Sequence, residues 1–222
     1  ADYDFSEFNI QQIVSELNAS LTSGVHAAIN GLFDRMSSQH TWYPECGKNI
    51  HYFNGWATNK AHKINRKVIL PINGFYSYSS WRHNELDTYH IYTTLGDIEK
   101  VLDYLDQGAT TEYSLRAALK LAEGSGKTKN IQCKYFSVTF YKKGTCHIVF
   151  HEQRIVDILN IYGARSRNWL PPDYGKRRYE DMSPDAQAVI DEFQGKAAYD
   201  EVMNQPGVYL PNLTTPLLAA AT

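Results

Sequence analysis

The chain has 222 residues, 43% of them hydrophobic, and its 22 Lys and Arg nearly balance 24 Asp and Glu. This composition is that of a globular protein and excludes a disordered or fibrous chain. No apolar run reaches the roughly 18–20 residues that a membrane-spanning helix requires, and the first residues are acidic where a secretory signal is basic. We therefore expect a cytoplasmic protein with no membrane partner.

The three cysteines are Cys46, Cys133 and Cys146. Their odd number and the lack of C-x-x-C spacing argue against a disulfide framework and a structural zinc site. No glycine-rich loop of the kind that binds a dinucleotide follows a predicted strand. The sequence therefore predicts no cofactor and no metal.

The first predicted element is a long amphipathic helix over residues 8–36, where apolar residues recur every three or four positions. Gly24 and Gly31 each cost about 1 kcal/mol in a helix interior, which leaves two helices in line as an alternative. A helix of this length usually packs along a partner helix.

Residues 37–96 are rich in aromatic and β-branched residues, and we predict short strands near 51–53, 67–72 and 76–81. Trp81 is expected in the core. Helical spacing returns over residues 97–107, which Gly108 follows, and over 112–123, which Gly124 follows.

The clearest local pattern is a hairpin over residues 133–151. Strands 133–141 and 145–151 flank the loop Lys142-Lys143-Gly144, which suits a type I turn followed by a left-handed glycine. This loop pairs Tyr141 with Thr145, so the residue numbers of every opposed pair in the two strands add up to 286. One face of the hairpin is wholly apolar and consists of Phe136, Val138, Phe140, Cys146, Ile148 and Phe150, whereas the other face is mostly polar.

A helix is predicted over 152–162, ending at Gly163, then a basic loop over 164–181 and a helix from Ser183-Pro184 to Gly195. Prolines indicate an extended tail over 206–222. The expected fold is therefore one α+β domain over residues 1–205, in which a long helix (8–36) precedes a mixed region (37–205). That region should hold a small, mostly antiparallel sheet and several packed helices.

Residues 120–180 carry twelve bases and five acids, a net charge of +7 within a chain of net charge −2. These Lys and Arg residues are interleaved with aromatic residues. Binding a nucleic acid requires both kinds, since cations neutralise phosphates and aromatic rings stack on nucleobases. The alternative is a solvated charged face that balances the acidic ends of the chain. The candidate nucleic-acid-binding residues are Lys134, Lys142, Lys143, Arg165, Arg167, Trp169, Lys176, Arg177 and Arg178.

The candidate catalytic residues are His147 and Tyr141. The hairpin register puts His147 opposite Thr139 and beside Tyr141 and Tyr135, on the polar face. Nearby lysines would keep the imidazole neutral near pH 7, ready to accept a proton. The alternative is an ordinary packing or hydrogen-bonding histidine.

Five residues of the hairpin and the following helix carry a family resemblance: Lys142, Gly144, His147, Phe150 and Asn160. Here the chain resembles an uncharacterised bacterial and phage family catalogued as domain of unknown function 4942. Members are often joined to DNA methyltransferases, so the resemblance implies a phage or mobile-element context of DNA modification or defence. This chain lacks the glycine loop and catalytic proline motif of a methyltransferase, which implies a companion domain.

Three functions remain open. The first is a nucleic-acid-associated accessory or target-recognition domain, with nucleic acid and a methyltransferase domain as partners. The second is an enzyme that acts on a nucleotide or phosphodiester with His147 as acid or base. The third is an inhibitor that binds a host defence protein through the long first helix.

Overall fold

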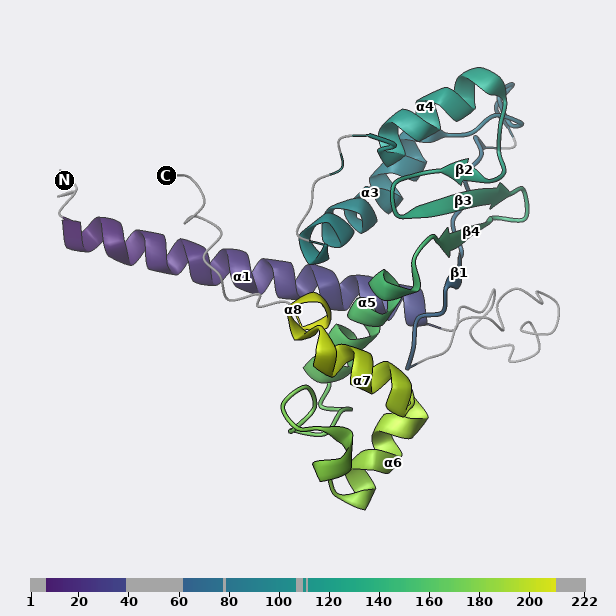
Figure 1. The fold of residues 1–222 in the computed structure, drawn as a ribbon. Helices are drawn as coiled ribbons and strands as arrows, with labels where there is room; N and C mark the ends of the chain where they lie inside the picture. Colours follow the sequence, from purple (N-terminus) through teal and green to yellow (C-terminus); the bar gives the residue numbers. More distant parts are fainter. Residues whose placement is uncertain (1–6, 39–61, 78, 107–109, 111, 211–222) are drawn as a thin grey trace, which may run out of the picture.

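The computed structural model describes residues 7–38, 62–77, 79–106, 110 and 112–210 (Figure 1). The elements are α1 (Glu7–Ser37), β1 (Lys67–Leu70), α3 (Thr88–Leu105), α4 (Leu115–Ser125), β2 (Ile131–Gln132), β3 (Phe136–Tyr141), β4 (Thr145–Phe150), α5 (Gln153–Ser166), the 3₁₀ helix η2 (Tyr179–Asp181), α6 (Pro184–Phe193), α7 (Lys196–Asn204) and α8 (Pro206–Tyr209). The α+β class is confirmed. In Figure 1, α3, α4 and the sheet form the upper part, α6 and α7 form the lower part, and α1 and α5 lie between them.

The four strands form one antiparallel sheet in the order β1-β4-β3-β2. The predicted pairs from Phe136 opposite Phe150 to Tyr141 opposite Thr145 are confirmed. Strand β3 begins at Phe136, three residues after the start predicted for it. Gly144 has φ 83°, the left-handed conformation that the turn requires. The six apolar residues of the predicted inner face are all buried. The alternation of side chains along the two strands was therefore sufficient to define the register.

Helix α1 is continuous through Gly24 and Gly31, so the alternative of two helices is wrong. Its second half enters the core, where Ile29, Phe33 and Met36 are fully buried. Its first half extends away from the rest of the chain (Figure 1). There a stripe of apolar side chains is 39–48% exposed: Ile10, Ile13, Val14, Leu17 and Leu21. Within the described residues, no helix combines the length and the apolar character that crossing a membrane requires.

Helix α5 runs to Ser166, past the end predicted at Gly163. Gly163 lies inside the helix against α1, where an added Cβ would overlap the ring of Phe33. The glycine therefore permits the close approach of α5 to α1 and does not end the helix.

The region before α4 departs most from the prediction. Helix α3 begins at Thr88, and the side chain of Asp87 caps it by accepting a hydrogen bond from the backbone N–H of His90 (3.0 Å). The described residues of the predicted strand 76–81, which are 76–77 and 79–81, lie outside any strand, so this prediction is wrong for them. Trp81 is 87% exposed, so the core position expected for it is also wrong. Helix α4 continues through Gly124, where its end was expected, to Ser125, and Gly126 caps it with φ 64°. The strand predicted near 51–53 lies outside the described residues.

The predicted extended tail is corrected at its start. Residues Pro206–Tyr209 form α8, whose Tyr209 is buried and donates a hydrogen bond from its hydroxyl to Glu201 (2.7 Å). Proline is tolerated in the first turn of a helix because its missing N–H has no helical partner there. The rest of that tail, residues 211–222, lies outside the described part of the chain.

Candidate nucleic-acid interface

Four lysines lie on two neighbouring segments at the end of the sheet where the hairpin turns. Lys142 and Lys143 form the turn between β3 and β4, and Lys127 and Lys129 lie in the segment that leads into β2. That segment runs beside β3, because the backbone N–H of Phe140 donates to the carbonyl of Thr128 (2.9 Å). We call Lys127, Lys129, Lys142 and Lys143 the hairpin-end patch.

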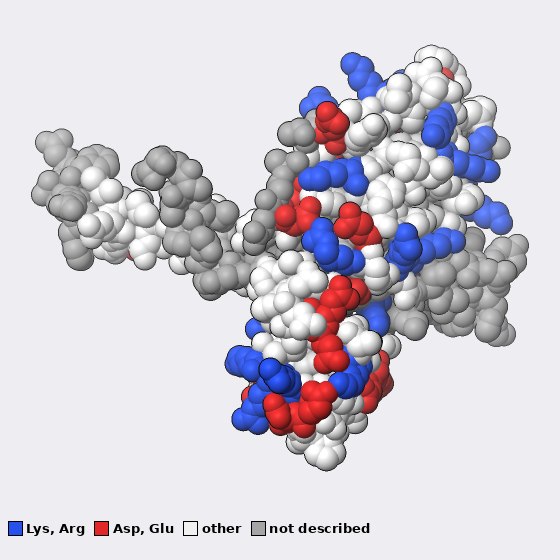
Figure 2. Space-filling view, in the orientation of Figure 1, with Lys and Arg blue, Asp and Glu red and all other residues white. Residues whose placement is uncertain are grey.

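All four lysines of the hairpin-end patch are exposed, and none forms an ion pair with a described residue. Lys142 donates to the neutral side chain of Asn84. In Figure 2, Lys and Arg side chains follow the edge of the upper part at which the hairpin turns, and Asp and Glu lie farther inward on this face. An unpaired, solvated ammonium group keeps its full charge for a phosphate.

Two aromatic features accompany this patch. Trp81 lies three residues before Asn84 and projects into solvent. The Arg82 guanidinium lies 5.9 Å from the centroid of the Trp81 ring. Tyr141, the last residue of β3, is 38% exposed beside the turn. Exposed aromatic rings next to lysine side chains that form no ion pair are the combination that binds single-stranded nucleic acid: the rings stack on nucleobases and the lysines attract phosphates.

His147 lies on the outer face of β4, between Thr139 of β3 and Ile69 of β1. Its ring centroid is 4.4 Å from that of Tyr141, so the predicted neighbourhood of these two side chains is confirmed. Burial and, to a smaller extent, the charge of Lys67 lower the pKa of His147 to about 4. The imidazole is therefore neutral at pH 7 and accepts hydrogen bonds, but it is too weak a base to hold a proton there.

This shift has a consequence for stability. The folded pKa lies below the value of about 6.5 for an unfolded histidine, so the unfolded state binds the proton first. We expect the contribution of His147 to stability to be lost progressively as pH falls from about 6.5 to about 4. An NMR titration of the ring should show a midpoint near pH 4, and His147→Gln should reduce the fall in Tm between pH 7 and 5. A midpoint near pH 6.5 would contradict this environment.

Tyr135 does not lie beside His147, which corrects the prediction. It is buried at the far end of the hairpin, where its hydroxyl donates to Asp103 of α3 (2.8 Å). Asp103 also accepts hydrogen bonds from Thr110 and Lys134. Burial alone would raise the pKa of Asp103, but these hydrogen bonds together hold it below its usual value. The Asp103 carboxylate thus fastens the end of α3 to the hairpin.

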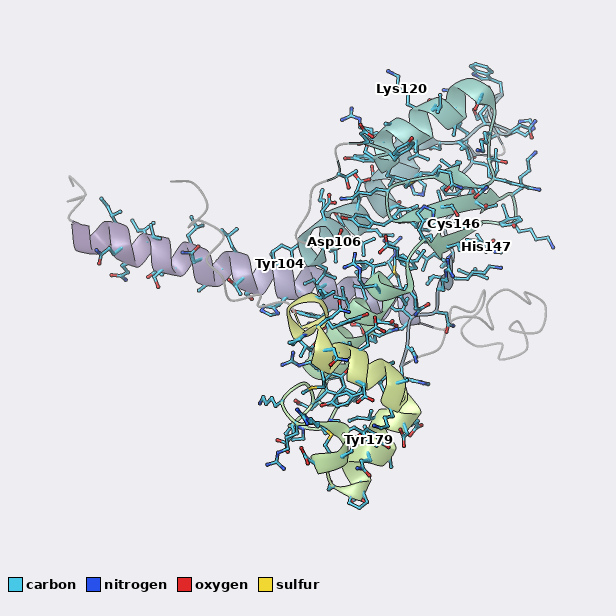
Figure 3. The ribbon with its side chains drawn as sticks, in the orientation of Figure 1. Tyr104, Asp106, Lys120, Cys146, His147 and Tyr179 are labelled. Atoms are coloured by element: carbon cyan, nitrogen blue, oxygen red, sulfur yellow. The ribbon has the colours of Figure 1, made fainter. Side chains whose placement is uncertain are left out.

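A second ion pair continues this polar cluster. Arg154 of α5 contacts Asp106 at 2.6 Å, and both line a small cavity of about 90 Å³ together with His151. Figure 3 shows Asp106 at the end of α3, well apart from His147 on the sheet. Because each acid here is already paired with a base, we interpret the cluster as structural. Lys134, a predicted nucleic-acid-binding residue, belongs to it through its 3.1 Å contact with Asp103.

The other predicted basic residues lie away from the hairpin. Arg167 pairs with Asp34 of α1 and covers the Phe33 ring, and Trp169 packs edge-on against the same ring (6.2 Å). Arg177 pairs with Asp173 at 3.3 Å. Arg165, Lys176 and Arg178 are exposed. The +7 segment is therefore divided between the two parts of the fold, and only Lys142 and Lys143 of the predicted set belong to the hairpin-end patch.

The cysteines and the metal-binding residue types were the other candidates for chemistry among the described residues. Burial raises the pKa of Cys133 and of Cys146 to about 12, so neither thiol is a nucleophile near neutral pH. Among the described residues, no group of three or more His, Cys, Asp or Glu side chains is arranged to hold a metal ion.

Sequence reasoning missed two parts of this interface. Lys127 and Lys129 count toward the +7 segment, but only their pairing beside β3 brings them to the hairpin turn. A core position is the usual expectation for a tryptophan such as Trp81, because large aromatic residues are mostly buried. A signal was present in its neighbourhood, since Ser79, Ser80 and Asn84 are residues typical of turns.

Comparison with protein-family models matches residues 1–169 to a family described as Domain of unknown function (DUF4942). This match spans α1, the whole sheet and α5. No curated protein and no solved structure matches the chain. The family description carries no activity, so the surface chemistry is what bears on function.

Proposed function

Since the chain belongs to the DUF4942 family, we propose from its surface chemistry that it is a nucleic-acid-associated accessory or target-recognition domain. The observation that carries the proposal is the hairpin-end patch, in which four exposed lysines at one end of the sheet form no ion pair with any residue that the structure describes. A role in DNA modification or defence, in a phage or mobile element, follows from the resemblance described above and belongs to the same proposal.

The geometry suits phosphate binding for a physical reason. A rigid hairpin turn holds Lys142 and Lys143 at a fixed position, and the paired segment beside β3 adds Lys127 and Lys129. Ammonium groups on a fixed framework bind a phosphate backbone with little loss of conformational freedom of the main chain. Sequence preference would come from other contacts, because phosphate contacts carry no base information.

Replacing all four lysines of the patch with Gln should weaken binding to a DNA or RNA fragment and flatten its salt dependence. Each lost phosphate contact removes about 0.9 from the slope of log K against log salt on duplex DNA, so four contacts remove about 3–4. The measurement is a fluorescence anisotropy titration at several salt concentrations. Because the four side chains are exposed, the melting temperature should stay nearly unchanged.

The chain offers a matched control in its lower part. Lys176, Arg177 and Arg178 are exposed bases of the same predicted segment but lie far from the hairpin (Figures 1 and 2). Their replacement with Gln should leave the slope as in the wild type. If this control removes the salt dependence and the patch variant does not, the interface is in the wrong place. If the wild type binds no nucleic acid even at low salt, the proposal fails.

The two alternatives stay predictions. An enzyme would use the neutral imidazole of His147 and the adjacent Tyr141, and a protein-binding inhibitor would use the apolar stripe of α1. Four cavities lined by described residues include neither His147 nor Tyr141 among their lining side chains. For this reason we place the nucleic-acid function first.

A further inference from the structure

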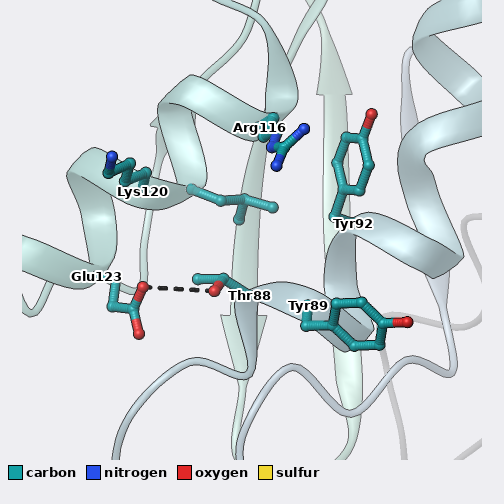
Figure 4. A pocket seen from close by; sticks show the side chains of 7 residues that line it. Thr88, Tyr89, Tyr92, Arg116, Lys120 and Glu123 are labelled. Atoms are coloured by element: carbon teal, nitrogen blue, oxygen red, sulfur yellow. Dashed lines mark hydrogen bonds between the residues drawn. The ribbon is translucent and has the colours of Figure 1, made fainter.

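A groove between α3 and α4 lies outside every site predicted from the sequence. Its walls are the first two turns of α3 and one face of α4, and its volume is about 430 Å³ (Figure 4). The lining residues are Thr88, Tyr89, Tyr92, Arg116, Leu119, Lys120 and Glu123. This volume falls within the roughly 300–1,000 Å³ of small-ligand sites and is enough for one nucleotide.

The groove carries positive charge. Arg116 and Lys120 are four residues apart on α4 and so lie on the same face of the helix. Neither forms an ion pair with a described residue. The single acid of the lining, Glu123, is bound by Arg82 from outside the groove (2.9 Å) and by the Thr88 hydroxyl (3.4 Å). Two cations therefore remain for an anionic ligand.

The groove also presents aromatic surface. Tyr89 and Tyr92 are three residues apart on α3, and Tyr89 is 81% exposed at the rim. The Arg116 guanidinium lies 5.8 Å from the ring centroid of Tyr92, and the buried side chain of Leu119 contributes to the lining. In Figure 4 the two tyrosines stand on one wall, and Arg116 and Lys120 stand on the other. An exposed tyrosine ring is a platform on which a base of any sequence stacks.

A continuous set of contacts joins this groove to the hairpin-end patch. Lys142 of the patch bonds to Asn84, and two residues earlier Arg82 bonds to Glu123 at the groove. The same guanidinium lies over the rings of Tyr76 (4.5 Å) and Trp81 (5.9 Å). The segment from Trp81 to Asn84 therefore contacts both the patch and the groove.

We propose that the α3–α4 groove binds one nucleotide unit of single-stranded nucleic acid, with its base stacked on Tyr89 and its phosphate held by Arg116 and Lys120. This inference rests on the proposed function and makes it more specific, because a base is free to stack on a tyrosine only where the strand is unpaired. The protein would then hold the phosphate backbone at the patch and an unpaired nucleotide of the same nucleic acid in the groove.

The test compares a labelled single-stranded oligonucleotide with a duplex of the same sequence. Tyr89→Ala and the double variant Arg116→Gln/Lys120→Gln should each weaken single-strand binding at least about fivefold, the lower range for losing one stacked base. Duplex binding should change much less. Tyr113→Ala and Lys100→Gln are the matched controls, since both side chains are exposed and lie outside the groove, and they should leave single-strand binding unchanged.

The outcomes separate the two proposals. If the groove variants bind the single strand like the wild type while the patch variant loses binding, the groove inference is overturned and the proposed function stands. If the patch variant binds normally and only the groove variants fail, the patch is overturned as the main contact. A nucleoside monophosphate that displaces the single strand at comparable concentration would also overturn the inference, because the groove would then be a site for a free nucleotide.

Discussion

Replacing Phe150 with Ala should lower the free energy of unfolding by about 3–5 kcal/mol, the usual cost of truncating a core aromatic residue. The Phe150 side chain is fully buried and packs edge-on against Phe136, its partner across the hairpin (6.3 Å). Its removal leaves a cavity beneath the sheet that rigid strands on either side cannot close. Urea denaturation followed by circular dichroism measures the loss, provided that the m-value is unchanged.

The neighbouring residue supplies the control for this experiment. Val149 lies on the opposite face of the same strand and is 37% exposed. Val149→Ala should cost well under the loss expected for Phe150→Ala, because much of the deleted surface is already in contact with water. Equal losses from the two variants would mean that the two faces of the hairpin are not distinguished in solution as they are in this fold.

The hairpin was predictable in detail because its determinants are local. Alternation of apolar and polar residues along two strands and a glycine at the turn specify the register without reference to the rest of the chain. The same holds for the start of α6, where Ser183 accepts a hydrogen bond from the N–H of Ala186 and Pro184 occupies the first turn.

The errors occurred where tertiary contacts override local preference. The helix predicted over 97–107 begins earlier, at Thr88. Residues 89–94 are mostly aromatic and β-branched, which disfavours a helix, yet they form the start of α3 because Ile91 and Leu95 are buried on one helical face. Gly163 predicted a helix end because glycine usually ends helices, whereas its true role is the approach of α5 to Phe33, 130 residues away in sequence. Neither contact is visible in a local window.

The candidate site was predictable only in part, for a related reason. Lys142 and Lys143 stand together in the sequence, so their proximity needed no fold. Lys127 and Lys129 join them through strand pairing, and the α3–α4 groove combines side chains from residues 88–92 with others from 116–123. Surface sites built from several elements leave no periodic signal in the sequence, because solvent-exposed positions tolerate most polar residues.

The residues that carry the family resemblance fall into two groups, those that the fold requires and those that it does not. Gly144 is explained by its left-handed turn conformation and Phe150 by the core. Lys142 and His147 have no such role, since one is exposed and the other is half-buried on the outer face. These two positions are therefore where a function of the hairpin is to be sought, and the fifth, Asn160, has a structural role of its own.

Asn160 connects helix α5 to the chain just before β1. Its buried side-chain amide donates to the carbonyl of Ile64 (2.9 Å) and accepts from the N–H of the same residue (2.7 Å). It thus pairs with the backbone of Ile64 as a neighbouring strand would. Only Asn and Gln combine a donor and an acceptor in this way, and the longer Gln side chain would displace the contact.

Asn160→Ala should therefore cost more than the loss of two ordinary hydrogen bonds. Both backbone groups of Ile64 would remain buried without partners, and each such group costs about 1–3 kcal/mol, so we expect a loss of about 2–6 kcal/mol in the free energy of unfolding. Amide hydrogen exchange gives a second reading, since the Ile64 N–H should be protected in the wild type and exchange faster in the variant. Asn204→Ala, at the exposed end of α7, is the control and should change stability by less than about 0.5 kcal/mol. A small loss with unchanged exchange at Ile64 would show that water replaces the Asn160 amide.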